Sequence, residues 1–341
     1  MAGTVAPGIR RIRVFVGGRL AAEKELVRRR FALDVPLPRR DVSIRVTAFD
    51  ALGRRSSTVV GPVFGLPRSS VSLAIPPRRG DPALSRTLRS LAARFPGTCA
   101  IYVRDLRTGR GAAWNERTEF PAASTLKVAI AVEFLRSSGA KPAPGTRTDV
   151  LLRRMLVYSE GKAANELLVQ LGGSTSGGSA RVNATMRALG LTNTDMYGGY
   201  EVEADRATPS FVGKRTTASD LALLDRHLHL AANARGLIVR RFRGQFTPSA
   251  ARYLLYVMAH VQEPGRLTRF RLGGGVAVLH KAGWIGTARH DSGLVYWPGG
   301  VFVATVMTWN PGGVGASADV LAGRVAVAAL RRFELLGRLH R

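Results

Sequence analysis

Ser124 and Lys127 are residues whose types and spacing suggest covalent chemistry. They lie three positions apart in FPAASTLKVAIAVEFL, residues 120–135, at the start of an apolar stretch that is expected to be helical. Side chains three apart on a helix share one face, so the hydroxyl and the amine are expected within hydrogen-bond reach. A serine becomes a nucleophile when a neighbouring group takes its proton. The pair therefore predicts a nucleophile with its base, although a capping serine beside a surface lysine would give the same spacing.

The use of lysine at position 127 is informative because arginine is the usual cation of this chain. Of its 51 lysine and arginine residues, only six are lysines. An ammonium can lose its proton when it is desolvated or lies near positive charge, whereas a guanidinium practically cannot. The partial positive charge at a helix N-terminus also favours the neutral amine. The choice of residue indicates a base.

Two later segments contain polar residues suited to the same site. MLVYSEGKAANELLVQLGG places Ser159 in a loop between two expected helices, and VLHKAGW places Lys281 on an expected strand that ends in Ala-Gly. Ser159 as a helix cap and Lys281 as a strand-edge charge are the alternative interpretations. A shared site for these residues is what the family resemblance given below implies.

The elements around these residues follow from the hydrophobic pattern. A helix is expected from Asp81, followed by a hairpin of TCAIYVRDL and GAAWNE. Helical spacing recurs over residues 148–157, 162–171, 179–189, 217–231 and 248–260. Three strand patterns come next, AVLHKAG, RHDSGLVYW and VFVATVMTW, and ASADVLAGRVAVAALRRFELL closes the chain as a long helix. This order predicts an α+β domain with one antiparallel sheet, packed helices and an inserted helical subdomain.

The order of the motifs resembles that of the class A β-lactamases and the related penicillin-binding serine hydrolases. The likeness lies in S-x-x-K, a loop serine before K-A-A-N, then H-K-A-G and R-H-D-x-G. It covers about residues 81–341. The resemblance implies a β-lactamase-like fold, with an antiparallel five-stranded sheet flanked by helices and an all-helical subdomain. It implies neither a metal nor an organic cofactor.

The resemblance also implies a role for each serine and for the first lysine. Ser124 would be the acylated nucleophile, and Lys127 would take its proton directly or through water. Ser159 would pass a proton to the leaving nitrogen. In the family an S-D-N motif stands at the loop serine, whereas this chain has Ser159-Glu160-Gly161, so the amide side chain is absent. Substrate orientation is therefore expected to differ.

For the H-K-A-G motif and the tryptophan that follows it, the resemblance implies substrate-binding roles. Lys281 would hold the substrate carboxylate, and the backbone N–H groups of Ser124 and Trp284 would form the oxyanion hole. Gly283 would allow a close approach of the backbone. Ala282 stands where the family's K-T-G motif has a hydroxyl, which leaves the carboxylate to Lys281.

The stretch MYGGYEVEADRATPSFVGKRTT lacks the E-x-x-L-N pattern with which class A enzymes activate the hydrolytic water. Glu201, Glu203 and Asp205 are candidate bases there, and a solvated acidic loop is the alternative. Without such a base the acyl-enzyme should turn over slowly. This favours a slow β-lactamase, a wall peptidase or a penicillin-binding protein over a fast antibiotic-resistance enzyme.

The N-terminal part of the chain has a different pattern. Short alternating runs bounded by Gly, Pro and Asp predict a small all-β sandwich over residues 9–66, with a weak likeness to immunoglobulin-like or fibronectin-like modules. Residues 67–80 are rich in Pro, Ser and Arg and are expected to be a linker. The hydrolase domain is then expected over residues 81–341.

Composition narrows the classes of partner and location. The net charge of +28 suits acidic wall polymers, although an arginine-rich solvated surface is the simpler interpretation; no nucleic-acid motif accompanies it. Neither a membrane span nor a secretory signal is apparent, and a single cysteine, Cys99, excludes an internal disulfide. We expect a monomer, with an extracytoplasmic location implied by the resemblance.

Histidines carry little of the predicted chemistry. His227 and His229 are two apart in a helical pattern, so their side chains should diverge and not form a metal pair. His290 and Asp291 are expected to stabilise their strand, and a place in the lining of the site is the alternative.

Two functional hypotheses follow. The first is a serine hydrolase that forms an acyl-enzyme with β-lactam amides or with D-Ala-D-Ala peptides of the cell wall. The second is a catalytically degenerate penicillin-binding-like or wall-binding protein, anchored by its basic N-terminal domain.

Overall fold

Two units make up the chain in this computed structural model, Met1–Arg68 and Ser69–Arg341. The structure describes residues 1–38, 41–65, 79–200, 214–263, 265–268, 270 and 272–339. Of the predicted linker, only Arg79 and Gly80 fall within these ranges, and they form strand β7 (Arg79–Gly80). Each unit has a hydrophobic core of its own.

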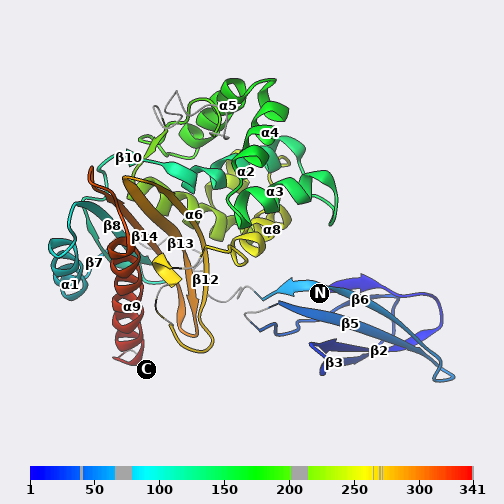
Figure 1. Ribbon diagram of the computed structural model, residues 1–341. Helices are drawn as coiled ribbons and strands as arrows, with labels where there is room; N and C mark the ends of the chain where they lie inside the picture. The colour runs from blue at the N-terminus through cyan, green and yellow to red at the C-terminus, as the bar shows by residue number, and fades with distance from the viewer. Residues whose placement is uncertain are drawn as a thin grey trace. The chain divides into compact units, whose positions relative to one another are not determined.

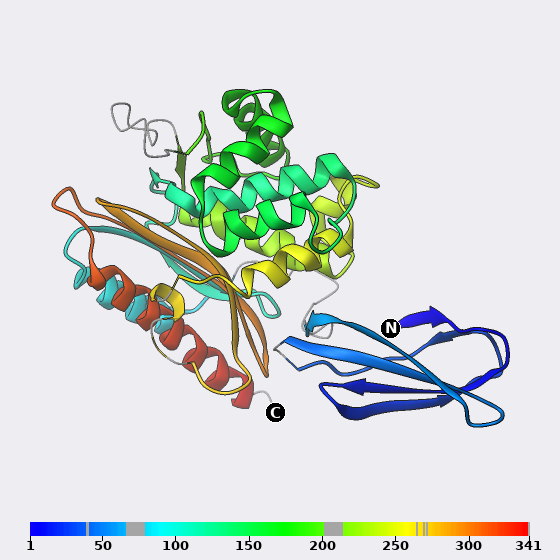
Figure 2. The same ribbon diagram turned by 45° about the vertical axis from the view of Figure 1, so that its right-hand side comes forward.

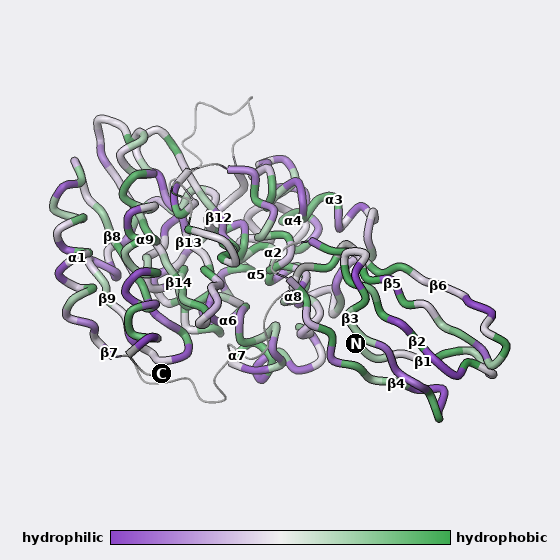
Figure 3. Tube along the Cα trace, turned by 90° about the horizontal axis from the view of Figure 1, so that it is seen from below, coloured by the Kyte–Doolittle hydropathy of each residue, from purple (hydrophilic) through white to green (hydrophobic). Residues whose placement is uncertain are grey.

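The N-terminal unit consists of antiparallel strands. They are β1 (Ala2–Thr4), β2 (Ile9–Val16), β3 (Arg19–Glu25), β4 (Arg30–Ala32), β5 (Asp41–Asp50) and β6 (Arg55–Phe64). Strands β3, β2, β5 and β6 form one sheet in that order, and β1 pairs with β4. In β5, Val42, Ile44 and Val46 are buried and alternate with exposed residues up to Arg45, and Figure 3 shows hydrophilic and hydrophobic stretches alternating along these strands. The strands are compatible with the expected immunoglobulin-like module, and β1 lies before the expected start at residue 9.

One sheet forms the centre of the second unit. Its remaining strands are β8 (Thr98–Asp105), β9 (Arg110–Trp114), β12 (Ala277–Ile285), β13 (Ala288–Trp297) and β14 (Gly300–Trp309). The strand order is β12-β13-β14-β8-β9-β7. The five predicted strands pair antiparallel, whereas β7 adds a sixth strand parallel to β9. The expected count of five was wrong because a two-residue strand has no periodicity to reveal it.

Helices α1 (Pro82–Ala93) and α9 (Ala316–Leu339) lie together against one face of the sheet (Figure 1). They share a hydrophobic cluster with its strands. Asp81 caps α1 by accepting a hydrogen bond from the Leu84 amide at 2.9 Å, which explains the predicted helix start. Cys99 is buried in this cluster, and burial raises the pKa of its thiol to about 11.

The other helices lie on the opposite side of the sheet from α9 (Figure 2). They are α2 (Lys127–Ser138), α3 (Arg147–Val157), α4 (Gly161–Gly172), α5 (Thr175–Ala188), α6 (Ala218–Ala232), α7 (Gly236–Arg241) and α8 (Pro248–Met258). Short elements connect them: β10 (Phe120–Pro121), η2 (Ala123–Leu126), β11 (Arg215–Thr216) and η3 (Arg266–Thr268). The five helical patterns beyond residue 147 match α3, α4, α5, α6 and α8, whereas α7 was not predicted. None of the helices within the described ranges is long and apolar enough to cross a membrane.

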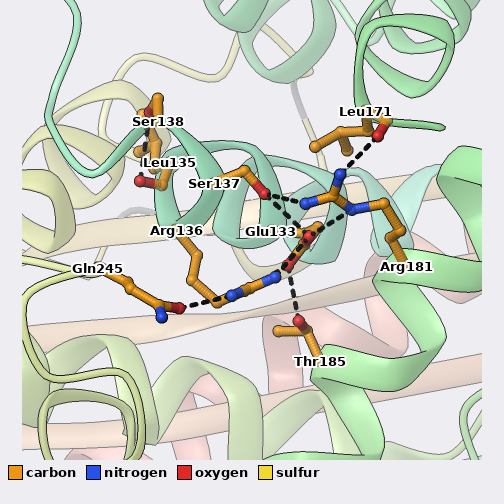
Figure 4. Close-up of polar contacts among 9 residues, drawn as sticks. All are labelled: Glu133, Leu135, Arg136, Ser137, Ser138, Leu171, Arg181, Thr185 and Gln245. Carbon is orange, nitrogen blue, oxygen red and sulfur yellow. Dashed lines mark hydrogen bonds and ion pairs between the residues drawn. The ribbon is translucent and has the colours of Figure 1, made fainter. Parts of the chain in front are cut away.

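A buried carboxylate joins α2 to α5. Glu133 on α2 is fully buried and accepts hydrogen bonds from Arg136 Nε at 2.6 Å, Arg181 Nε at 3.2 Å and Thr185 Oγ1 at 2.6 Å (Figure 4). Burial alone would raise the pKa of Glu133, but the hydrogen bonds from Arg136, Thr185 and Ser137 hold it below its usual value. The network fixes the helix whose first residue is Lys127.

Candidate active site

Ser124 lies in the short 3₁₀ helix η2, between strand β10 and helix α2. The sequence predicted that Ser124 opens the helix, but α2 begins at Lys127 and the side chain of Ser124 does not cap it. Ala123 has a φ of 47°, a left-handed conformation that is costly for a residue with a side chain. The Thr125 hydroxyl donates to the Ala122 carbonyl at 2.6 Å and stabilises the turn. Ser124 is therefore held by a tight turn in place of regular helix.

The amine of Lys127 meets the hydroxyl of Ser124, as the three-residue spacing predicts. The distance from Lys127 Nζ to Ser124 Oγ is 3.0 Å, and Lys127 also donates a short hydrogen bond to the Ser159 carbonyl. Only 2% of Lys127 is exposed. Its stem and amine are enclosed, so no bulk water competes for the contact with the hydroxyl.

The surroundings of Lys127 lower the pKa of its amine. Burial, reinforced by the positive charge of Lys281, lowers the pKa of Lys127 to about 7. The carboxylates of Glu263 and Glu160 act in the opposite direction. A substantial fraction of the amine is therefore neutral at neutral pH, which is the state that a base requires.

Ser159 is in the connection between α3 and α4, as predicted, and adopts a left-handed φ of 59°. Its Oγ is buried and has no hydrogen-bond partner within the described part of the chain. Buried hydroxyls in native proteins are normally paired. Within the described part of the chain, the Ser159 hydroxyl is therefore an unpaired polar group on the residue whose carbonyl accepts from Lys127.

Lys281, Gly283 and Trp284 lie on β12, an edge strand of the sheet. A Cβ added to Gly283 would lie 2.8 Å from the backbone nitrogens of both Ser124 and Thr125. Only glycine allows this approach of β12 to η2. Lys281 is 1% exposed, whereas the Trp284 side chain is 59% exposed. The structure thus brings together Ser124, Lys127 and Ser159, and it places β12 directly beside the serine.

Glu263 is the residue at this site that sequence reasoning missed. Its Oε2 lies 3.1 Å from Lys281 Nζ, in the segment between α8 and η3. Burial lowers the pKa of Lys281 even though the Glu263 carboxylate opposes that shift. Glu263 belongs to no motif and lies 18 positions before Lys281. The only sequence signal for this pair was an acidic residue in a segment between two expected elements. Arg266, nearby in η3, is also buried.

Tyr200 and Lys214 form another part of the surroundings that the motifs did not reveal. The Lys127 and Lys214 ammonium nitrogens lie 4.4 and 5.2 Å from the Tyr200 ring centroid. The Tyr200 hydroxyl donates to the Ala123 carbonyl at 3.2 Å, and its backbone pairs with the Asn165 side chain. The asparagine of K-A-A-N therefore supports the wall of the site. The candidate deacylation bases, Glu201 and Glu203, and Asp205 lie outside the described residues.

The histidines make structural contacts. His227 Nε2 lies 3.0 Å from the Leu189 carbonyl, and His229 Nδ1 lies 2.8 Å from the Tyr296 hydroxyl, so the two point to different partners as predicted. His290 bonds to the Pro121 carbonyl, and Asp291 lies 2.9 Å from His280 Nδ1. Among the residues that the structure describes, no group of three or more His, Cys, Asp or Glu could hold a metal ion.

The chain belongs to the Beta-lactamase enzyme family, whose sequence profile matches residues 83–143 and 140–333, well over half of its length. Members of this family are serine hydrolases of the β-lactamase type, so the fold and family expected from the motifs are confirmed. Among curated proteins, none matches significantly.

Solved structures support the same fold. A mutant of PBP-A, determined as an acyl-enzyme complex with penicillin G, is 24% identical, has a TM-score of 0.61, and covers 76% of this chain and 99% of its own. A β-lactamase from Chitinophaga pinensis is 17% identical with a TM-score of 0.60, covering 74% and 99%. One from Sphaerobacter thermophilus is 20% identical with a TM-score of 0.59, covering 74% and 97%. The likeness extends over almost the whole of each of these proteins.

Proposed function

We propose that the chain is a serine hydrolase in which Ser124 is acylated by β-lactam amides or by D-Ala-D-Ala peptides of the cell wall. The observation that carries this proposal is the 3.0 Å contact between Ser124 Oγ and Lys127 Nζ, with the pKa of Lys127 lowered to about 7. The Ser124 hydroxyl has a proton to give, and the enclosed amine of Lys127, which is readily neutral, can accept it.

The chemistry of acylation follows from these positions. Neutral Lys127 takes the proton of Ser124 Oγ as the oxygen attacks the substrate carbonyl carbon. The negative charge that develops on the carbonyl oxygen is stabilised by the backbone N–H groups of Ser124 and Trp284. Ser159 gives its proton to the leaving nitrogen as the carbon–nitrogen bond breaks, and the proton that Lys127 took from Ser124 restores the Ser159 hydroxyl. The product is an ester at Ser124.

Turnover requires water to attack that ester with a base beside it. The sequence offers no E-x-x-L-N pattern, and slow deacylation is the expected consequence. A slow β-lactamase or a penicillin-binding protein fits this expectation better than a fast resistance enzyme. A PBP-A mutant of the same fold has been determined as an acyl-enzyme complex with penicillin G, which supports the formation of such an ester here.

Intact-mass analysis after incubation with penicillin G tests the proposal. We expect one penicilloyl adduct on the wild-type chain and none on Ser124→Ala. Lys127→Arg should slow acylation about 100-fold or more, because a guanidinium does not act as a base. Lys141→Arg, an exposed lysine exchanged in the same way, is the matched control and should keep the adduct.

The absence of an adduct on the wild-type chain with both penicillin G and its methyl ester, or an undiminished adduct on Ser124→Ala, would contradict an acyl-enzyme function. That outcome, together with salt-sensitive retention on isolated cell walls, would favour the wall-binding alternative.

A further inference from the structure

Lys281 already has a carboxylate partner inside the site. Its Nζ lies 3.1 Å from Glu263 Oε2, with the lysine side chain 1% exposed and the glutamate side chain 12% exposed. A pair this enclosed is screened little by salt or solvent. The ammonium that the proposed function assigns to the substrate carboxylate is thus engaged before substrate arrives.

The charges near Lys281 are balanced without a ligand. The carboxylates of Glu263 and Asp291 both favour its charged form, whereas the positive charge of Arg266 disfavours it. Asp291 is itself held by His280 at 2.9 Å and by the Leu267 amide at 3.1 Å, so it is fixed in the structure. The two carboxylates thus match Lys281 and Arg266 in number, and the further cation that interacts with Lys281, Lys127, has a pKa of about 7 and is neutral in the form that acts as a base.

A substrate carboxylate placed at Lys281 would therefore be a third acidic group. Like charges at short range in a desolvated site are strongly unfavourable, so either Glu263 must leave or it must take up a proton. A neutral group meets no such opposition. It can accept a hydrogen bond from Lys281 while the ion pair stays intact, because an ammonium has three donors.

We propose that Glu263 is an internal carboxylate that occupies the anion-accepting side of Lys281, so that the site selects substrates with an uncharged amide or ester there over free acids. The inference rests on the proposed function, since it concerns the substrate class of the same site. The preferred substrate class is then a β-lactam or wall peptide whose carboxylate is amidated or esterified.

A cycle of two substrates and two proteins isolates the effect of Glu263. The second-order rate constant for acylation of Ser124 is measured by intact mass for penicillin G and for its methyl ester, on the wild type and on Glu263→Gln. We expect the substitution to raise the acid-to-ester rate ratio about tenfold or more, the size of a hydrogen bond to a charged group. Glu263→Asp, which keeps the charge, should leave the ratio near its wild-type value.

Glu160→Gln is the matched control. Glu160 also favours the charged form of Lys127, but its carboxylate pairs with Arg154 at 2.6 Å, whereas the carboxylate that pairs with Lys281 is that of Glu263. Its removal should change the rates of both substrates by the same factor and leave the ratio unchanged. Because the ester reports acylation independently of the carboxylate, an adduct with the ester also shows that each variant is folded.

The outcomes separate the two proposals. Adducts with an acid-to-ester ratio that Glu263→Gln leaves unchanged, or lowers, overturn the role of Glu263 and leave the acyl-enzyme function standing. The absence of any Ser124 adduct with either substrate overturns both.

Discussion

The imidazole of His290 donates from Nε2 to the carbonyl oxygen of Pro121 at 2.7 Å, three residues before Ser124. Its Nδ1 accepts a hydrogen bond from the Thr308 amide at 3.2 Å, so the tautomer is defined by its partners. Burial lowers the pKa of His290 to about 4, which keeps the ring neutral. One side chain thus ties strands β13 and β14 to the segment that enters the serine turn.

Replacing His290 by phenylalanine should destabilise the protein by about 1–3 kcal/mol, because it leaves a buried carbonyl and a buried amide unpaired. Urea denaturation measures the loss. His260→Phe, at a half-buried position at the end of α8, is the comparison and should have a smaller effect. Equal stabilities of wild type and His290→Phe would show that the Pro121 contact contributes nothing.

The rate of acylation should rise with pH through a midpoint near 7 and then level off. The amine of Lys127 must be neutral to take the proton of Ser124, and its neutral fraction grows as the pH passes its pKa of about 7. Since Glu160 opposes the lowering of that pKa, Glu160→Gln should move the midpoint to lower pH. Acylation that is independent of pH between 5 and 9, as read by stopped-flow or quenched mass analysis, would count against Lys127 as the base.

Removing the Ser159 hydroxyl should lower the acylation rate without lowering the stability of the protein. Its Oγ has no partner within the described ranges, so Ser159→Ala breaks no hydrogen bond there and should leave the melting temperature within about 2 °C of wild type. The acylation rate should fall about 100-fold to 10,000-fold if the hydroxyl transfers a proton. A variant that melts normally and acylates at the wild-type rate would remove Ser159 from the mechanism.

Gly283→Ala should abolish acylation, because the added methyl group would lie 2.8 Å from the Ser124 and Thr125 nitrogens and force β12 away from η2. Gly286→Ala is the matched control in the same hairpin, where a Cβ would meet nothing within 4 Å. Penicillin labelling followed by intact mass distinguishes them. Similar labelling of both variants would mean that the close approach is not required.

Glu133→Gln should cost about 3 kcal/mol, because it leaves Arg136 and Arg181 without their carboxylate in a largely buried network. Since the pKa of Glu133 lies below its usual value, its stabilisation is present above about pH 4.5 and is lost as the pH falls through the folded-state pKa. Glu166→Gln, which breaks the exposed pair with Arg147, should cost at most about 1 kcal/mol. Denaturation curves of the wild type and both variants at pH 7 and pH 3 check these expectations. If Glu133→Gln lowered the stability by the same amount at both pH values, the stated pH dependence would be contradicted.

Much of this structure could be predicted from local sequence patterns. The spacing of Ser124 and Lys127 predicts their contact because one helical turn has a fixed geometry, and the Asp81 cap predicts the start of α1. The strand patterns near the C-terminus predict β12, β13 and β14 because each is a mostly apolar run of nine or ten residues, as expected of strands that are buried on both faces. The family assignment came from the order of short motifs, which the family profile confirms.

Contacts between residues far apart in the sequence could not be predicted in this way. The pairing of Glu263 with Lys281 depends on where a connection passes over a sheet edge, and nothing in its neighbouring residues encodes that path. Similarly, β7 exists because its two residues happen to lie beside β9. The 3₁₀ turn at Ser124 replaced the expected helix start because β10 and His290 hold the preceding backbone in place.

The sparing use of lysine has a practical consequence for chemical labelling. Lys24, Lys141 and Lys162 are exposed, whereas Lys127, Lys214 and Lys281 are buried. Lys127, with its pKa lowered to about 7, is largely neutral at neutral pH, yet its enclosure shields it from bulky reagents. Succinimidyl esters should therefore couple the protein to a resin or a dye through peripheral side chains and leave the interior amines intact.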